Sequence, residues 1–184
     1  MTVPKDQSKI EEAVSPSYKM RLYLMRHGIA IDREDPDSPE EAQRFLTEKG
    51  IERTRSAAYG LAQLEIQPTA LLSSPYLRAM QTGEIVCEAL DIDTKQLRTT
   101  DSLKPSSEPA RLAGELARMP EEEVICFGHA PQLDDFIAHA VRANAAITAL
   151  KKAGAACLEV ESFSPLKAKL AWVLTSKILR SLGG

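Results

Sequence analysis

Four side chains that could bind or attack an anion each follow an apolar run of the sequence: Arg26, His27, Arg78 and His129. Guanidinium groups bind phosphate oxygens in a two-point geometry. A neutral imidazole keeps one ring nitrogen free, and this nitrogen can attack phosphorus to form a phosphohistidine. The combination therefore favours a site that holds a phosphoryl group and transfers it.

Each of these residues also has an ordinary structural interpretation. Arg26 and Arg78 could be surface arginines, and His27 and His129 could be hydrogen-bonded histidines at strand ends. Their joint placement after three buried strands favours the functional interpretation. A structural role is expected instead for three polar residues of the segment after His129: Asp134, Asp135 and His139.

The apolar runs that precede the four residues are typical of strands buried on both faces of a sheet. These strands are predicted at residues 18–25, 68–73 and 124–127. The carboxyl ends of parallel strands meet at one edge of a sheet, where ligands bind. We therefore expect the two arginines and two histidines to gather there. Gly28 lets the backbone turn tightly at this edge and lets a ligand approach closely.

Two of the strands run directly into predicted helix starts. Ser74 is expected to be an N-cap with Pro75 at the first helical position, and Pro131 is expected to begin another helix. Helix N-termini offer free N–H groups to anions. A nucleotide-binding loop of the form GxxxxGK[ST] does not occur in the sequence, so such a loop does not explain the predicted phosphate site.

The remaining segments predict the layers around these strands. Helices are predicted from about 47, with Thr47 as the N-cap, to about 64, and at 76–90, 108–119, 131–142 and 176–184, and two last strands at 156–161 and 169–175. Alternating strands and helices predict an α/β fold, a single-domain three-layer α/β/α sandwich with a mostly parallel central sheet. The last two strands, joined without a helix, predict an antiparallel edge. Residues 1–18 are expected to be a flexible N-terminal arm before one domain at 19–184.

Composition excludes several classes of protein. A net charge of −3 does not favour nucleic-acid binding, because that interaction depends on a basic surface. No apolar run is long enough to span a membrane, and the polar first 17 residues do not resemble a secretory signal. The cysteines, Cys87, Cys126 and Cys157, form no CxxC pair, so we expect reduced, buried thiols in a cytoplasmic protein. Their spacing encodes neither a zinc site nor a redox motif, and no cofactor is expected.

Three ordered motifs resemble the histidine phosphatase superfamily, also known as the phosphoglycerate-mutase-like or RHG proteins. They are Leu24-Met25-Arg26-His27-Gly28, the segment from Ser73 to Thr82, and Phe127-Gly128-His129. The resemblance covers roughly residues 20–175 and implies the phosphoglycerate-mutase-like fold and metal-independent chemistry. It also implies that His27 is phosphorylated during turnover, that Arg26 and Arg78, beside Gly28, hold the phosphoryl oxygens, and that His129 stabilises charge in the transition state.

Within the superfamily, the chain most resembles the SixA-type phosphohistidine phosphatases. Many other members carry a glutamate in a Leu-x-Glu context after the second motif, or an aspartate after the second histidine. Here the corresponding residues are Pro105, in Leu103-Lys104-Pro105, and Ala130. An alkoxide leaving group normally needs a positioned acid, whereas imidazole leaves a phosphoramidate with less help. The resemblance therefore implies hydrolysis of phosphohistidine on a partner protein, such as a histidine-containing phosphotransfer domain.

Two other functions stay open. Asp101, Glu108 or the acidic loop at 32–37 could supply the missing acid, and the protein would then hydrolyse small phosphomonoesters. A non-catalytic module that binds phosphorylated proteins is the other alternative. The presence of all four core residues favours an enzyme over such a module.

Overall fold

The computed structural model describes residues 18–184, as α-helices and strands with short 3₁₀ turns between them. The strands are β1 (Met20–Arg26), β2 (Ala70–Ser73), β3 (Leu97–Thr99), β4 (Glu123–Gly128), β5 (Ala155–Phe163) and β6 (Leu166–Leu174). The helices are α1 (Glu48–Ala62), α2 (Leu77–Ala89), α3 (Pro109–Leu116), α4 (Gln132–Ala140) and α5 (Ser176–Leu182). The expected arm at 1–18 lies, apart from Tyr18, outside the described residues.

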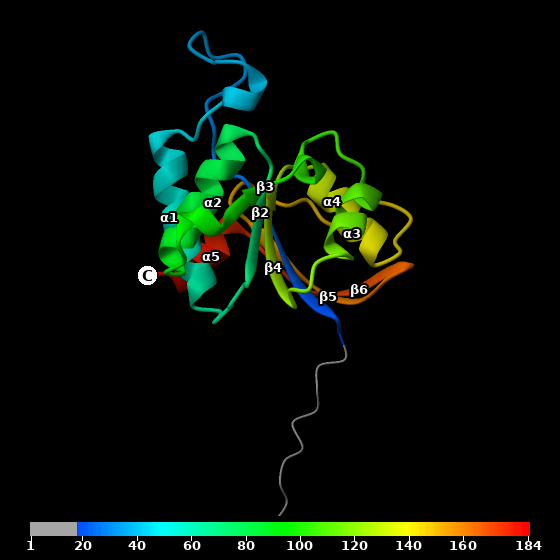
Figure 1. Ribbon diagram of the computed structural model, residues 1–184. Coiled ribbons are helices and arrows are strands. Elements are labelled where there is room, and N and C mark those ends of the chain that lie inside the picture. The colour runs from blue at the N-terminus through cyan, green and yellow to red at the C-terminus, as the bar shows by residue number, and fades with distance from the viewer. Residues whose placement is uncertain (1–17) are drawn as a thin grey trace, which may run out of the picture.

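The strands form one mixed sheet in the order β3-β2-β4-β1-β5-β6 (Figure 1). β1, β2, β3 and β4 run parallel to one another, while β5 and β6 are antiparallel to their neighbours. This confirms the expected parallel centre and antiparallel edge. β1 lies inside the sheet, between β4 and β5, so the segment that ends in Arg26 and His27 is held on both sides.

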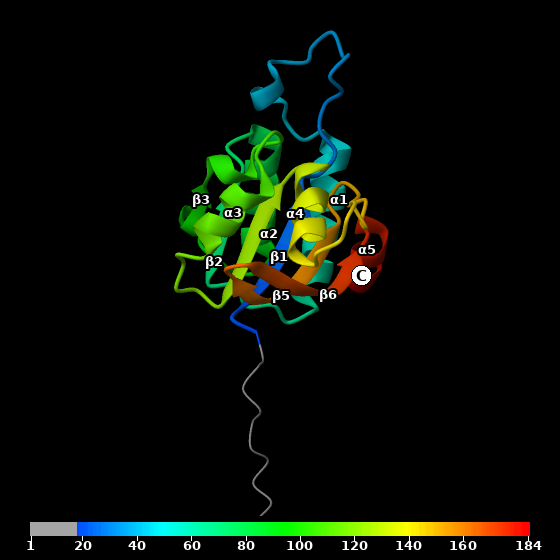
Figure 2. The ribbon, with the colours of Figure 1, turned by 90° about the vertical axis from the view of Figure 1, so that its right-hand side faces the viewer.

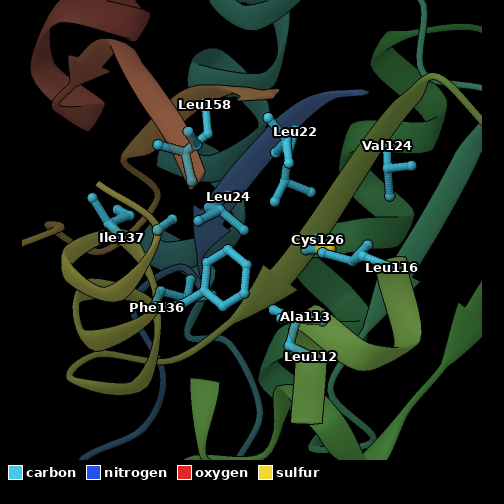
Figure 3. Packing of buried hydrophobic residues seen from close by; sticks show 14 of the residues in the cluster. Leu22, Leu24, Leu112, Ala113, Leu116, Val124, Cys126, Phe136, Ile137 and Leu158 are labelled. Atoms are coloured by element: carbon cyan, nitrogen blue, oxygen red, sulfur yellow. The ribbon is translucent and has the colours of Figure 1, made fainter. Parts of the chain in front are cut away.

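Helices cover both faces of the sheet, which makes the molecule a three-layer α/β/α sandwich. Figure 1 shows α1, α2 and α5 on one face and α3 and α4 on the other. A hydrophobic core lies on each face of the sheet, and alternate residues of β1 point into the two cores. Leu22 and Leu24 pack toward α3 and α4 (Figure 3), and Tyr23 and Met25 belong to the core on the opposite face. Burial on both faces explains why this strand is an unbroken apolar run.

The element boundaries confirm most sequence predictions and correct one. Thr47 caps α1 as expected, because its Oγ1 accepts a hydrogen bond from the Gly50 N–H at 3.0 Å. The prediction that Ser74 caps α2 was wrong: the helix begins two residues later than expected, at Leu77, and Tyr76 occupies the N-cap position. The Ser74 hydroxyl contacts His129 Nε2 at 2.9 Å and accepts a weaker hydrogen bond from the Tyr76 N–H at 3.3 Å.

One further expectation is met within residues 18–184. The three cysteines are buried and unpaired, as expected of reduced thiols. No helix in this part of the chain has both the length and the apolar character that are needed to cross a membrane.

Candidate active site

The carboxyl ends of β1, β2 and β4 lie in register at one edge of the sheet. Arg26 pairs with Gly128 across the β1–β4 ladder, and the His27 N–H donates to the Gly128 carbonyl at 3.0 Å. On the other side of β4, the Ser74 N–H donates to the Phe127 carbonyl at 2.9 Å. Backbone hydrogen bonds between parallel strands therefore bring the three sequence motifs to one place, as the sequence predicts.

Arg78 joins the two predicted histidines. Its Nε lies 3.2 Å from His27 Nε2, and its Nη2 lies 3.3 Å from His129 Nδ1. The two imidazole rings are 5.1 Å apart between centroids. All three side chains are more than nine-tenths buried, with exposed fractions of 3%, 7% and 2% for Arg78, His27 and His129. The structure thus gathers these three residues around one point.

The hydrogen bonds assign the protons on both rings. A guanidinium only donates, so His27 Nε2 and His129 Nδ1 must be the unprotonated nitrogens that accept from Arg78. The other nitrogen of His27 then donates to the Gly28 carbonyl at 2.7 Å, and that of His129 donates to Ser74 Oγ at 2.9 Å. His27 therefore presents an unprotonated nitrogen, Nε2, at the centre of the site, where it accepts a hydrogen bond from Arg78.

The environment keeps both histidines neutral. Burial lowers the pKa of His27 to about 3, against an opposing hydrogen bond to the Gly28 carbonyl, and Arg78 and Arg26 lower it further. Burial also lowers the pKa of His129 to about 2, with further contributions from His27 and the same two arginines. Neutral imidazole is the nucleophilic form, so the site holds His27 ready to attack an electrophile.

Arg26 lies at the wall of the same cavity but makes different contacts. Its Nη1 donates to the Leu150 carbonyl at 2.8 Å, while its buried Nε has no partner among the described residues. The Leu150 N–H in turn donates to Asp134 Oδ1 at 2.9 Å, which gives Asp134 the structural role expected from the sequence. Arg26 thus retains N–H groups that a ligand in the cavity can use.

Gly28 supports the turn between His27 and the following loop. Its N–H donates to Thr82 Oγ1 at 3.0 Å, and that hydroxyl donates to the Arg78 carbonyl at 2.7 Å. A Cβ at position 28 would collide with the Thr54 side chain, so only glycine fits against α1 at this point. The role predicted for Gly28, close backbone approach, therefore includes packing against a helix as well as space for a ligand.

Sequence reasoning missed Glu41, which stands at the centre of the site. Its Oε1 lies 2.8 Å from Arg78 Nη2, and its carbonyl accepts from Arg78 Nη1 at 2.7 Å. The same carboxylate pairs with Arg33 and Arg44, each at 3.0 Å. These cations hold its pKa below the usual value against the opposing effect of burial. An anionic carboxylate therefore accepts a hydrogen bond from Arg78 Nη2, a donor that a phosphoryl group bound to Arg78 would need.

Glu41 belongs to the segment between β1 and α1, which rises above the edge of the sheet in Figure 2. Part of this segment, residues 32–37, is predicted from the sequence to be an acidic surface loop. The side chains of these residues are exposed in the structure. The cavity beneath has a volume of about 410 Å³. Its charged lining, besides the residues already described, consists of Asp32, Glu34 and Lys152.

Pro105 and Ala130, which the sequence resemblance aligns with acidic positions, also line this cavity. The other acids considered from sequence lie elsewhere. Asp101 is paired with Lys104 at 2.8 Å, and Glu108, at the start of α3, is exposed; neither lines the cavity. Asp32 and Glu34, from the predicted acidic loop, are the candidate acids that do line it.

Comparisons with known proteins agree with this geometry. The family description "Histidine phosphatase superfamily (branch 1)" matches residues 22–105. An uncharacterized protein of Picosynechococcus sp. is 37% identical over 120 residues, which cover 64% of this chain and 70% of that protein. The phosphohistidine phosphatase SixA of Escherichia coli is 27% identical over 122 residues, 65% of this chain and 73% of its own.

Two further matches extend the comparison. The mitochondrial serine/threonine-protein phosphatase Pgam5 of Drosophila persimilis is 27% identical over 93 residues, which are half of this chain but only 31% of Pgam5. A solved structure of the protein histidine phosphatase SixA with tungstate superimposes with a TM-score of 0.76 at 22% identity, covering 87% of this chain and 99% of SixA. The chain therefore belongs to the histidine phosphatase superfamily and is a phosphatase of that family.

Proposed function

We propose that this phosphatase hydrolyses phosphohistidine on a partner protein, through a phosphohistidine intermediate on His27. The proposal assigns His27 as nucleophile, Arg26 and Arg78 as ligands of the phosphoryl oxygens, and His129 as the group that stabilises charge in the transition state. A histidine-containing phosphotransfer domain is the expected kind of partner. The similarity to SixA supports this substrate class.

The proposed reaction proceeds in two steps. His27 Nε2 attacks the phosphorus of a substrate phosphohistidine whose other ring nitrogen is protonated, the P–N bond breaks, and the substrate side chain leaves as neutral imidazole. Water then attacks the phosphorus carried by His27, which releases inorganic phosphate and restores the free imidazole. In each step the charge on the phosphoryl oxygens is met by Arg78 and Arg26. The bound phosphoryl dianion also favours a protonated His129, which can then donate to one of these oxygens.

One observation carries the preference for a P–N bond: the two positions that hold the acid in related enzymes line this cavity without a carboxylate. Pro105 and Ala130 offer no proton to a leaving group. Glu41 does not substitute for them, because its pairing with Arg78, Arg33 and Arg44 keeps it ionised. General acid catalysis contributes about 10²- to 10⁴-fold where it operates. Its loss is far more costly for an alkoxide than for an imidazole leaving group.

A second candidate function is hydrolysis of phosphate esters. It is favoured by Asp32 and Glu34, whose side chains line the cavity from the loop above it. Either carboxyl group could deliver a proton to an ester oxygen if substrate binding brings the loop closer. The variants Asp32→Asn and Glu34→Gln separate the two functions: ester hydrolysis would fall by about 10²-fold or more, while phosphohistidine hydrolysis would be unchanged.

The decisive experiment compares substrates directly. We expect kcat/KM for a phosphohistidine-containing phosphotransfer domain to exceed that for sugar and nucleotide monophosphates by at least about 10²-fold. This is the lower end of the rate increase that a general acid gives to ester hydrolysis, and esters would lack that increase here. Comparable or faster ester turnover would refute the proposed substrate class. Saturable binding without phosphate release would refute catalysis altogether.

The covalent step has its own test. We expect His27→Ala to lower turnover by at least about 10³-fold, because the nucleophile is removed. Rapid acid-free quenching of the wild type with ³²P-labelled substrate should trap label on the protein, and His27→Ala should trap none. The exposed His139 provides the matched control, since His139→Ala should keep both turnover and label. Near-normal turnover in His27→Ala would exclude the intermediate.

A further inference from the structure

A second cavity, of about 460 Å³, adjoins the active site on the side of α1 and α5. Its walls come from α1, from the turn before β5 and from the first residues of α5; Figures 1 and 2 show α1 and α5 side by side. Six cationic residues line it: Arg26, Arg53, Lys151, Lys152, Lys177 and Arg180. We refer to it as the basic hollow.

The basic hollow is unusual because nothing in its lining balances its charge. Within residues 18–184, none of its six cations forms an ion pair, and its other lining residues are uncharged. Glu48 and Glu52 line a neighbouring cavity together with Arg53 and Arg180, but neither carboxylate reaches them as an ion pair. This local positive charge stands out in a chain whose net charge is −3. Clustered positive charges attract anions from solution.

Buried polar atoms in the lining point to a ligand independently of charge. Arg26 Nε, Arg180 Nε and Thr54 Oγ1 are all buried and have no hydrogen-bond partner among the described residues. Thr54 is fully buried, with an exposed fraction of 0%. Buried donors are nearly always paired in folded proteins. Three residues of the lining thus each keep a polar atom that the described residues leave unpaired, and N–H and O–H groups of this kind are suited to the oxygens of an anion.

The two cavities share a wall, because Arg26 and Lys152 line both of them. An anion in the basic hollow would therefore lie next to a phosphoryl group held at His27. We propose that the basic hollow is a second anion-binding site, which binds a carboxylate or phosphate group of the same substrate that is dephosphorylated at His27. This inference rests on the proposed phosphatase site, and it predicts a preference for phosphorylated substrates with a neighbouring acidic group.

Binding of inorganic phosphate to the full chain tests the site without catalysis. Titration followed by ¹⁵N NMR should shift two groups of amides with separate affinities, one around residues 27–28 and 128–129 and one around 151–153 and 175–177. The double variant Lys151→Gln with Lys177→Gln should lose only the second group. Both lysines are exposed, so the variant should fold normally. Shifts confined to the first group, or unaffected by the double variant, would overturn the second site.

A matched control carries the same change in net charge elsewhere on the surface. Lys95→Gln with Arg118→Gln alters two exposed cations outside both cavities and should leave all phosphate-induced shifts unchanged. Arg180→Gln gives a second, independent probe of the basic hollow and should weaken the second group of shifts only. Absence of shifts around 27–28 would instead contradict the proposed active site, so the two failures are distinguishable.

Kinetics then identify where the second anion comes from. A phosphohistidine peptide flanked by glutamates should have a KM at least fivefold lower than the same peptide flanked by glutamines, and the double variant should abolish this difference without changing kcat. As a small-molecule arm, 4-carboxyphenyl phosphate should inhibit better than phenyl phosphate if small acidic substrates are bound. A difference between the two peptides indicates that the second anion belongs to an acidic protein segment. A difference between the two aryl phosphates alone indicates that it belongs to a small molecule. No difference in either pair would refute the inference.

Discussion

At the scale of single residues, the site is organised by Arg78, which contacts both histidines and Glu41 at once. A fully buried guanidinium with three partners is held in one orientation before any substrate arrives. Its Nη2 is occupied by a carboxylate in the free protein, and an incoming phosphoryl dianion must displace that carboxylate. The free protein is therefore arranged around an anionic group, with Glu41 in the position that we propose for the phosphoryl group.

Ser74 contacts His129, for which we propose a catalytic role, and can hold that ring in one orientation. Its Oγ accepts from His129 Nε2 at 2.9 Å, which fixes the tautomer that leaves Nδ1 facing Arg78. Ser74→Ala removes this acceptor, so we expect kcat to fall about tenfold, corresponding to one hydrogen bond of about 1.4 kcal/mol, with little change in KM. Steady-state kinetics measure the split between kcat and KM.

A purely structural role for Ser74 would not alter the His129 ring. The ¹⁵N shifts of that ring should therefore change from one tautomer in the wild type to a mixture in Ser74→Ala. Ser73→Ala is the matched control, because the neighbouring hydroxyl bonds only to the Ser74 carbonyl. Equal effects of the two substitutions, or an unchanged His129 tautomer, would contradict the positioning role.

At the scale of elements, the packing of α1 against α5 depends on Gly60. A Cβ at this position would collide with the Leu179 carbonyl, and the obstacle is backbone that cannot move aside. We expect Gly60→Ala to lower the free energy of unfolding by about 1–3 kcal/mol, since overpacking outweighs the gain in helix propensity. Urea unfolding monitored by circular dichroism measures the change.

Gly114 in α3 supplies the opposite case. Nothing lies within 4 Å of a Cβ built at that position, so Gly114→Ala should raise the free energy of unfolding by about 0.5–1 kcal/mol. The two substitutions are chemically identical and both lie in helices. If Gly60→Ala also stabilised the protein, α1 and α5 could not be packed as closely as the structure shows.

At the scale of the whole molecule, the apolar pattern of the sequence predicted which strands carry the site, but it did not predict the individual contacts of the side chains there. The apolar runs before His27, Ser74 and His129 indicated parallel strands, and parallel pairing alone brings their ends together. Glu41 could not be found in this way, because it lies on a short 3₁₀ turn after a proline-rich loop with no periodicity. Likewise, no pattern around Gly60 indicates why glycine stands there, because the reason is the approach of α5, a segment over 100 residues further along the chain.

Burial of two neutral histidines makes the stability of the whole fold depend on pH. Their folded pKa values, about 3 for His27 and about 2 for His129, lie below the unfolded value of about 6.5. The unfolded chain therefore binds more protons, so the stability from each neutral histidine is complete above pH 6.5. It is lost as the pH falls below 6.5 toward the folded values.

The expected slope is about 1.4 kcal/mol per pH unit for each histidine below pH 6.5. Urea unfolding in phosphate-free buffer at pH 7.5 and pH 5.0 should therefore show that His27→Gln loses about 2 kcal/mol less than the wild type. The exposed His139 is the control, and His139→Gln should lose as much as the wild type does, because carboxylates elsewhere contribute equally to both. Parallel losses in all three proteins would mean that His27 has the same pKa in the folded and unfolded chain, so burial would not be what keeps this imidazole neutral.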